Sequence, residues 1–454
     1  MAGLPCHYYA KINYVMKQFT VSPLANPIKT TISVPSDKSI SHRAVIIGSI
    51  ANGRTEIKNF LSSADCLNTL KIMQQLGIEI SNCNNYETVT IYGRGLQSFS
   101  EPKNILNCGN SGTTIRLLSG LLSAQNFLSI LTGDDSLLNR PMGRVIEPLT
   151  LMGAKIAGRD NNTKAPIVIS PGVLHGITYD MPVSSAQVKS AIMLAALQAK
   201  GETRIIEKEK SRDHTERMLA AFGATIKQDK NEVVIGSEQK LQAQNIFIPG
   251  DISSAAFFMA ACSIIPGSEM VLQKVLVNPT RTGIINVLKK MGVKVEITNK
   301  KEISGEPVAD LFVTSSELNA LEVKGSTIPL LIDEVPILCI LMAQANGKSV
   351  IKDAKELRFK ESDRLKTMAQ VLRKFSVEVN ELDDGLEING LAGKPFIINN
   401  FIEWPHHFDH RIAMSIAIAA LKSNEPVIVP GAEWISTSFP DFEKLIHQLQ
   451  MAVV

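Results

Sequence analysis

The sequence predicts an α/β protein built from six copies of one unit, grouped as two domains of three units each. Three observations support this. A polar turn that begins a short apolar helix recurs six times along the 454 residues. A second pattern, which ends a helix and begins a strand, falls between the first. The chain is also too long for a single core, and its 44% hydrophobic and 20% charged residues are typical of a globular protein.

The polar turns each supply an Asp, Ser or Asn suited to a helix N-cap, and a Gly or Asn follows most of the helices, where a helix ends. They recur every 69 to 80 residues, at 36–39, 110–113, 184–187, 250–253, 333–334 and 409–411. The helices that follow are apolar on nearly every side. We therefore expect them to be buried inside the domains.

The second pattern places a glycine between two apolar residues. It occurs around Gly77, Gly153, Gly223 and Gly292, with Ser376 in the fifth copy. Each copy is expected to end an amphipathic helix and start a strand. Each unit then reads helix, strand, helix, strand.

The natural break between three-unit domains lies near residues 248–250. The first strand, at 30–35, precedes the first unit and could cross to the second domain.

Composition excludes several classes of protein. The net charge is only +3 and aromatic residues make up 5%, so neither a basic stripe nor a base-stacking platform is indicated. The longest apolar run, 412–421, is too short to span a membrane, and residues 1–20 lack a signal-peptide core. The cysteines form no Cys-x-x-Cys pair and are expected to be reduced thiols: Cys6, Cys66, Cys83, Cys108, Cys262 and Cys339. We expect a cytoplasmic protein that binds neither nucleic acid nor membrane.

Positive charge gathers at the turns although the whole chain is nearly neutral. If the helix N-termini face a common cleft, their unpaired N–H groups make it an anion site. The cations at or near the turns are Lys38, Arg43, Arg116, Arg140, Arg212, Lys360, Arg364 and Arg411. Asp333 and Glu361 lie among them and are candidates for proton transfer. This pattern favours a small, multiply charged substrate over a polymer.

Motifs for other chemistries are missing. The turn at 110–114 has no Gly-Lys-Ser/Thr and is not a phosphate-binding P-loop, and neither a dinucleotide fingerprint nor a Gly-x-Ser-x-Gly turn occurs. His406, His407 and His410 cluster, but no Cys or carboxylate has credible zinc spacing with them. The sequence therefore predicts no metal site.

The motifs of this chain resemble those of one family, the 5-enolpyruvylshikimate-3-phosphate synthases. The matching segments run in family order over nearly the whole chain: PSDKSISHR (35–43), GNSGTTIR (109–116), RPM (140–142), SAQVKS (185–190), SRDHTE (211–216), GDISSA (250–255), KESDRL (360–365), DHR (409–411) and TSFP (437–440). The resemblance implies a two-domain inside-out α/β barrel of six β-α-β-α-β-β units. It also implies that the second domain contains both chain ends. The expected parts are a flexible extension at 1–20, one domain at 36–248, and one at 21–35 plus 249–454.

The resemblance also implies an activity. The enzyme would transfer the enolpyruvyl group of phosphoenolpyruvate to the 5-hydroxyl of shikimate 3-phosphate and release phosphate, with no metal or organic cofactor, as a monomer. Asp333 would accept the hydroxyl proton, and Glu361, assisted by Lys38, would protonate the methylene carbon. Closure of the two domains is the expected way to assemble the site. Glyphosate occupies the phosphoenolpyruvate site in this family.

The substrate contacts implied by the resemblance form two overlapping sets. Shikimate 3-phosphate would contact Lys38, Ser39, Arg43, Ser185, Ala186, Gln187, Arg212, Asp333 and Lys360. Phosphoenolpyruvate would contact Lys38, Gly112, Arg140, Gln187, Arg364 and Arg411.

Two alternatives remain open. A sister enzyme with the same fold transfers enolpyruvyl to UDP-N-acetylglucosamine, but it typically has Lys-Asn at the first helix start and a reactive Cys between the second and third repeats. This chain has Lys38-Ser39, and no Cys lies between Cys108 and Cys262. A non-catalytic repeat protein that binds anionic metabolites is the other alternative, and the pair Asp333 and Glu361 argues against it.

Overall fold

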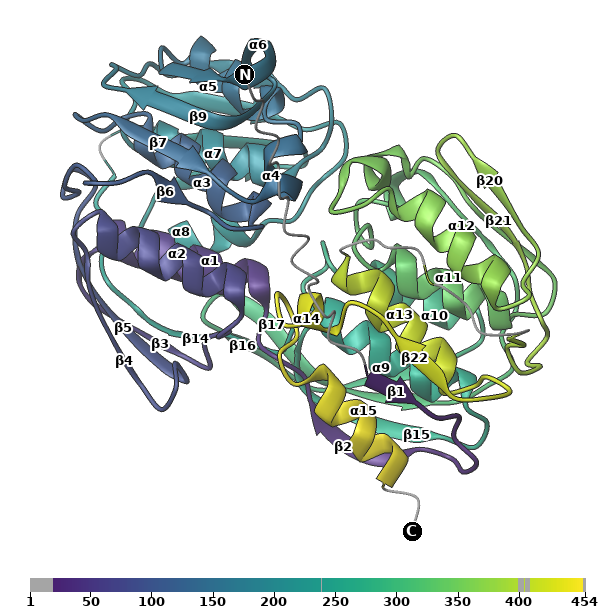
Figure 1. The fold of residues 1–454 in the computed structure, drawn as a ribbon. Coiled ribbons are helices and arrows are strands. Elements are labelled where there is room, and N and C mark those ends of the chain that lie inside the picture. The colour runs from purple at the N-terminus through teal and green to yellow at the C-terminus, as the bar shows by residue number, and fades with distance from the viewer. Residues whose placement is uncertain (1–18, 238, 399–403, 405–408, 452–454) are drawn as a thin grey trace, which may run out of the picture.

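The computed structural model describes residues 19–237, 239–398, 404 and 409–451. Figure 1 shows two lobes: residues 36–248, purple to teal, form one, and the later teal, green and yellow residues, joined by the purple residues 19–33, form the other. Residues 1–18 of the expected extension, and His406 and His407, lie outside the described residues. Phe19 and Thr20 were expected to belong to the extension, but they form strand β1 (Phe19–Val21), because Phe19 and Val21 are buried in the second lobe.

Six inner helices begin at the six predicted turns. They are α1 (Lys38–Ile50), α3 (Gly112–Leu122), α7 (Ala186–Ala196), α9 (Ile252–Ile264), α11 (Val335–Gln344) and α13 (His410–Ala420). The side chains of Asp37, Ser111, Asp251 and Asp409 each accept a hydrogen bond from a backbone N–H in the first turn of their helix. These caps leave the remaining first-turn N–H groups of each helix available.

The second pattern ends five outer helices, as predicted. They are α2 (Ala64–Gln75), α5 (Gly143–Leu151), α8 (His214–Ala221), α10 (Gly283–Lys290) and α12 (Arg364–Lys374). Gly77, Gly153, Gly223 and Gly292 have φ between 86° and 99°, a left-handed conformation that favours glycine. Ser376 adopts the same turn with φ 57°.

Replacing Ser376 with Gly is expected to stabilise the protein by about 0.5–1 kcal/mol, because a side chain in the left-handed region costs roughly 1–2 kcal/mol. The Ser376 hydroxyl donates one exposed hydrogen bond to the Ile397 carbonyl, and its loss offsets part of the gain. The measurement is the urea midpoint of unfolding. Gly292→Ser is the matched control and should lower the midpoint, since its Cβ would lie 3.2 Å from Asn319 Nδ2. An unchanged midpoint for Ser376→Gly would contradict the strain argument.

The described strands form five four-stranded sheets and one two-stranded sheet. Each four-stranded sheet contains one parallel pair, at one edge, and two antiparallel pairs. In the first lobe the orders are β14-β3-β5-β4 (Asn245–Phe247, Asn52–Lys58, Thr88–Arg94, Glu79–Cys83), β6-β7-β9-β8 (Leu106–Asn107, Ser129–Thr132, Lys164–Ser170, Lys155–Gly158) and β10-β11-β13-β12 (Thr178–Asp180, Thr203–Ile206, Glu232–Ile235, Ile226–Asp229).

The second lobe contains two such sheets and the short one. Their orders are β16-β17-β15-β2 (Lys294–Ile303, Glu306–Thr314, Glu269–Leu276, Lys29–Ser33), β18-β19-β21-β20 (Glu322–Val323, Lys348–Ile351, Gly385–Asn389, Val379–Leu382) and β1-β22 (Phe19–Val21, Val427–Val429). The sixth unit is therefore shortened: its β22 pairs antiparallel with β1, and helices α14 (Ala432–Ile435) and α15 (Phe442–Met451) follow. The sheets stay separate in the described residues and do not join into one closed barrel. The predicted α/β repeat fold with buried helices is confirmed.

Two segments cross between the lobes. The first crossing follows β2, which pairs in parallel with β15 of the second lobe. The second crossing follows β14, which pairs in parallel with β3 of the first lobe. The segments that enter and leave the first lobe are joined where they cross, since the Asp37 amide donates to the Pro249 carbonyl and the Asp251 amide to the Pro35 carbonyl. Buried apolar residues form one cluster per lobe. We propose domain boundaries at 35/36 and 248/249 on this basis.

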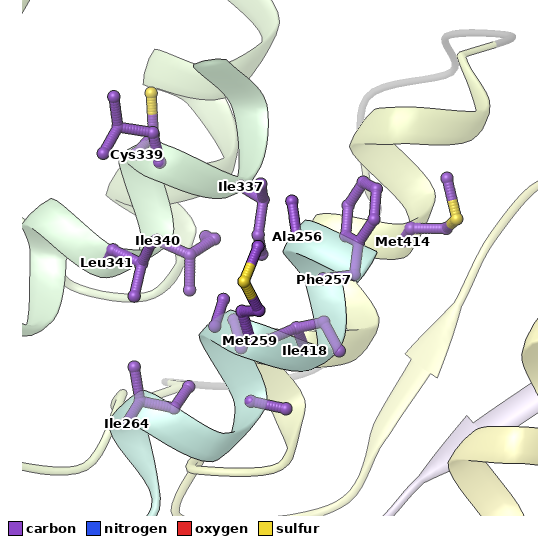
Figure 2. Packing of buried hydrophobic residues seen from close by; sticks show 14 of the residues in the cluster. Ala256, Phe257, Met259, Ile264, Ile337, Cys339, Ile340, Leu341, Met414 and Ile418 are labelled. Carbon is purple, nitrogen blue, oxygen red and sulfur yellow. The ribbon is translucent and has the colours of Figure 1, made fainter. Parts of the chain in front are cut away.

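Three inner helices meet in the core of the second lobe. Figure 2 shows Phe257 and Met259 of α9, Ile337 and Ile340 of α11, and Ile418 of α13 gathered where these helices meet. Helices α9, α11 and α13 contact one another pairwise. The other short segments are α4 (Asp135–Asn139), α6 (Arg159–Asn162), η1 (Gly325–Thr327) and η2 (Lys355–Phe359). None of the helices in the described part of the chain combines the length and hydropathy needed to span a bilayer.

Candidate active site

The first turns of the inner helices from both lobes converge on one cavity of about 110 Å³. It is lined by Lys38, Ser39, Thr113, Arg116, Arg140, Gln187, Arg212, Asp251, Arg281, Asp333, Phe359, Lys360, Glu361, Arg364, His410 and Arg411. A second cavity of about 340 Å³ lies beside it and shares Arg116, Gln187, Arg212, Asp333, Phe359 and Lys360 with the first. Helix N-termini and side-chain cations thus face the same space, which favours anionic ligands.

Most of the residues selected from the sequence meet here. Ten line the smaller cavity: Lys38, Ser39, Arg140, Gln187, Arg212, Asp333, Lys360, Glu361, Arg364 and Arg411. Ser185 and Ala186 line only the larger cavity. Gly112 is not among the lining residues of either cavity, so its expected contact with phosphoenolpyruvate stays a prediction. A Cβ added to Gly112 would be 3.1 Å from Arg140 Nη1 and 3.2 Å from Arg116 Nη1. The absence of a side chain at Gly112 lets these two guanidinium groups approach the helix start.

Arg43 does not line either cavity. It is buried in the first lobe, where its guanidinium donates to Thr215 Oγ1 at 2.7 Å, Ser190 Oγ at 2.9 Å and the Ser39 carbonyl at 3.0 Å. Burial lowers the pKa of Arg43 to about 10, with Glu216 opposing that effect. In this structure Arg43 supports the Ser39 turn from behind, and its expected contact with shikimate 3-phosphate stays a prediction.

Asp333 lies between four cations. Its carboxylate is 2.6 Å from Arg212 Nη2, 3.3 Å from Arg364 Nη1, 3.9 Å from Lys360 Nζ and 4.0 Å from Arg411 Nη2. Burial favours the neutral acid, but Arg212, Arg411, Lys360 and Arg364 outweigh it and hold the pKa of Asp333 well below its ordinary value. Asp333 is therefore ionised at neutral pH.

Glu361 is held by a second group of cations. It lies 2.7 Å from Arg364 Nη2 and 3.5 Å from Arg140 Nη1. Burial again favours the neutral acid, but Arg364 and Arg140 dominate and hold the pKa of Glu361 well below its ordinary value. Burial lowers the pKa of the adjacent His410 to about 3, with Arg411 adding to the effect, so that imidazole is neutral.

Ion pairs join the two lobes across the cavities. Arg140 pairs with Glu361, Arg212 with Asp333, and Arg144 with Glu356 at 2.9 Å; in each pair the cation comes from the first lobe and the carboxylate from the second. Because an anionic substrate can replace a carboxylate as the partner of an arginine, these pairs mark where substrate charge would be held.

Lys38 forms an ion pair with Asp65 of α2, and Arg364 donates from Nε to Asp409 Oδ2 at 2.8 Å. Asp65 and Asp409 fix the two side chains without occupying the cavity wall. Such supporting contacts are part of what orients a site.

Several cavity residues were not predicted as substrate contacts or catalytic groups: Thr113, Arg116, Asp251, Arg281, Phe359 and His410. Arg116 was predicted only as one of the cations near the helix starts; here it donates to Gln187 Oε1 and to the Pro141 carbonyl. Arg281 lies just before α10, and the association of cations with helix starts could have indicated it. Phe359 and Thr113 gave no signal that separates them from ordinary loop and helix residues.

A cationic cavity between two lobes, with two carboxylates among its cations, is typical of an enzyme site for small anionic ligands. The comparisons agree. The sequence pattern of EPSP synthase (3-phosphoshikimate 1-carboxyvinyltransferase) matches residues 24–446, and the chain belongs to this family.

Curated relatives and solved structures are similar over nearly the whole chain. The 3-phosphoshikimate 1-carboxyvinyltransferase of Petrotoga mobilis is 49% identical over 95% of this chain and 99% of its own. That of Geobacter sp. (strain M21) is 50% identical over the same shares. An EPSP synthase structure from Acinetobacter baumannii superposes with a TM-score of 0.83 at 43% identity, covering 95% of this chain and 98% of that chain.

Proposed function

We propose that this chain transfers the enolpyruvyl group of phosphoenolpyruvate to the 5-hydroxyl of shikimate 3-phosphate and releases phosphate. One observation carries the proposal: two ionised carboxylates, Asp333 and Glu361, are held by cations of both lobes at a cavity formed by six helix starts. Family membership and the names of the relatives support the choice of substrates.

Binding would begin when the anionic substrates replace protein carboxylates as partners of the arginines. In our proposal phosphoenolpyruvate lies against Lys38, Gly112, Arg140, Gln187, Arg364 and Arg411. Arg140 and Arg364 are paired with Glu361 in this structure. They would then also bind the carboxylate and phosphate of phosphoenolpyruvate. Shikimate 3-phosphate would lie in the larger cavity against Ser185, Ala186, Arg212 and Lys360, with Asp333 near its 5-hydroxyl. Holding both substrates in one orientation can contribute about 7–11 kcal/mol to lowering the barrier.

The chemistry then needs two proton transfers. Asp333 accepts the proton of the 5-hydroxyl, whose oxygen bonds to the carbon that carries the phosphate. Glu361, with Lys38, donates a proton to the methylene carbon. The resulting tetrahedral adduct loses phosphate, and its methyl group returns a proton to restore the double bond. The cations stabilise the leaving phosphate.

Glu361 cannot serve as an acid while its pKa is depressed. The depression comes from Arg364 and Arg140, which oppose the effect of burial. Once phosphoenolpyruvate places negative charge against these arginines, the stabilisation of the Glu361 carboxylate falls and its pKa rises. The substrate therefore creates the protonated acid that acts on it.

The deciding experiment follows phosphate release with phosphoenolpyruvate and either shikimate 3-phosphate or UDP-N-acetylglucosamine as acceptor. We expect release only with shikimate 3-phosphate. Release only with the nucleotide sugar would assign the sister activity. Release with neither acceptor, from folded protein, would indicate a binding protein.

Substrate binding is expected to take up protons through Glu361. Because the free carboxyl is ionised and its pKa rises on binding, titration of the shikimate 3-phosphate complex with phosphoenolpyruvate near pH 6 should remove protons from the buffer. The measurement is calorimetry in two buffers of different ionisation enthalpy. The phosphate groups of the ligands titrate in the same range, so the informative quantity is the wild-type uptake minus that of Glu361→Gln. Equal uptake by the two proteins would contradict the role given to Glu361.

Replacing Gly112 with Ala is expected to raise the KM for phosphoenolpyruvate about 10-fold, because a displacement of the Arg140 and Arg116 guanidinium groups costs roughly 1–2 kcal/mol of ligand binding. The KM for shikimate 3-phosphate should change little. Steady-state kinetics with each substrate varied would measure both. Gly236→Ala is the control, since its Cβ would have no atom within 4 Å. A rise in both KM values together would contradict a local effect on the phosphoenolpyruvate site.

We also propose that the enzyme is a cytoplasmic monomer that needs neither metal nor organic cofactor. Sedimentation at working concentration would test the oligomeric state, and activity after exhaustive chelation would test the metal requirement.

A further inference from the structure

Arg281 is a buried cation at the cavity that the mechanism above does not use. It follows β15 and precedes α10, its side chain is 2% exposed, and it lines the smaller cavity. Burying a guanidinium is costly unless it is paired and hydrogen-bonded. The contacts that pair it therefore indicate what it does.

The two ends of the guanidinium bind different groups. Nη1 lies 3.0 Å from Asp37 Oδ2 and 3.2 Å from His214 Nε2. Nη2 donates to Asp251 Oδ1 at 2.9 Å and to Ser253 Oγ at 2.8 Å. Asp37 and His214 belong to the first lobe, whereas Asp251 and Ser253 begin α9 in the second. One side chain thus joins the two lobes directly behind the cavity.

Each partner is next to a residue of the proposed site. Asp37 caps α1 and immediately precedes Lys38. His214 is two residues after Arg212 on the turn that begins α8. The Ser253 hydroxyl hydrogen-bonds to Glu334 Oε1, and Glu334 immediately follows Asp333. The contacts of one guanidinium therefore lead to the turns that carry Lys38, Arg212 and Asp333.

The fork geometry of arginine is what this arrangement requires. Asp37 and Asp251 are both buried, and each is an N-cap of an inner helix. Burial favours the neutral form of Asp37, but Arg281 and His214 hold its pKa below the ordinary value, so it stays charged. A lysine has one ammonium group and cannot reproduce parallel donation from two nitrogens to two carboxylates.

We propose that Arg281 is a positioning residue of the active site. Its contacts hold the turns that carry Lys38, Arg212 and Asp333 in fixed positions relative to one another, and so fix the relative position of the two lobes that catalysis requires. This inference rests on the proposed function. Arg281 does not need to touch substrate in this role, because it acts through Asp37, His214 and Ser253. A misplacement of about 1 Å in such a site can reduce a rate about 10²-fold.

The test is Arg281→Lys in the full-length protein, assayed by phosphate release well below its Tm. We expect kcat to fall about 10²-fold while both KM values change less than about 5-fold, because the side chains that hold substrate charge are all still present. Val313→Ala is the control for lost stability: Val313 is fully buried on β17 in the core of the second lobe and does not line the cavity. It should lower Tm and leave kcat unchanged.

Asp37→Ser provides an independent variant in case Arg281→Lys does not fold. Serine can still cap α1, so the helix start survives while the ion pair to Arg281 is lost. We expect a kcat loss of about 10-fold or more. The double variant should lose less than the product of the two single losses, because both remove one interaction.

The results distinguish failure of the positioning role of Arg281 from failure of the proposed function. Non-additive kcat losses in Arg281→Lys and Asp37→Ser, with Val313→Ala active, would support the positioning role. A wild-type kcat in either folded variant, or a loss confined to KM, would overturn it while leaving the proposed function intact. Wild-type protein that released no phosphate would overturn the proposed function and this inference with it.

Discussion

Glu361→Gln is expected to lower kcat by about 10²–10⁴-fold, the usual contribution of one positioned acid or base. The amide keeps the shape of the side chain but cannot donate a proton of suitable acidity to the methylene carbon. Binding of phosphoenolpyruvate should not weaken, because the substitution removes a negative charge that competes with the substrate for Arg364 and Arg140. Phosphate release measures kcat, and calorimetry measures the Kd for phosphoenolpyruvate.

Glu387→Gln is the matched control for this substitution. Glu387 lies on β21 on the outer sheet and pairs with Lys348 at 3.0 Å, away from the cavity. It should retain wild-type kcat. A Glu361→Gln protein with kcat within about 3-fold of wild type would remove Glu361 from the proton-transfer step and leave Lys38 as the candidate acid.

Asp333→Asn is expected to lower kcat by a similar factor, about 10²–10⁴-fold, because the amide cannot accept the proton of the 5-hydroxyl. Here the binding consequence is the more informative readout. Arg212, Lys360, Arg364 and Arg411 would lose the carboxylate that they now share. Arg212 and Lys360, which the proposal places against shikimate 3-phosphate, would no longer be neutralised by Asp333 and should bind that substrate as tightly as before, or more tightly. The Kd for shikimate 3-phosphate measures this.

Asp310→Asn is the corresponding control, since Asp310 lies on β17 and accepts from the Lys274 amide outside the cavity. Loss of shikimate 3-phosphate binding in Asp333→Asn, with the fold retained, would assign Asp333 to substrate binding in place of proton transfer. Retained turnover would exclude both roles.

The repeat architecture was predictable because its signals are local. An N-cap such as Asp37 or Ser111 bonds within the first turn of its own helix, and a left-handed glycine such as Gly77 closes the helix that precedes it. These interactions involve residues three to five positions apart, so the sequence alone shows where each helix begins and ends. The gathering of cations at helix starts followed from the same pattern.

Side-chain direction was harder to predict. Arg43 and Arg364 both lie near helix starts and look alike in the sequence, yet Arg43 turns into the first lobe and Arg364 faces the cavity. The difference depends on whether Thr215 and Ser190, more than 140 residues away, approach the guanidinium. Burial of this kind is decided by packing between distant helices, which periodicity does not reveal.

The sequence by itself determined the six helix starts, the α/β repeat and the type of ligand, a small anion, because each rests on neighbouring residues and on charge. Only the tertiary structure decided which carboxylate meets which cation and where the shortened sixth unit finds its strand partner. Arg212 and Asp333 are 121 residues apart, and Arg281 and Asp37 are 244 apart. Pairs at such separations exist only after the two lobes dock, and nothing in the local sequence fixes that docking.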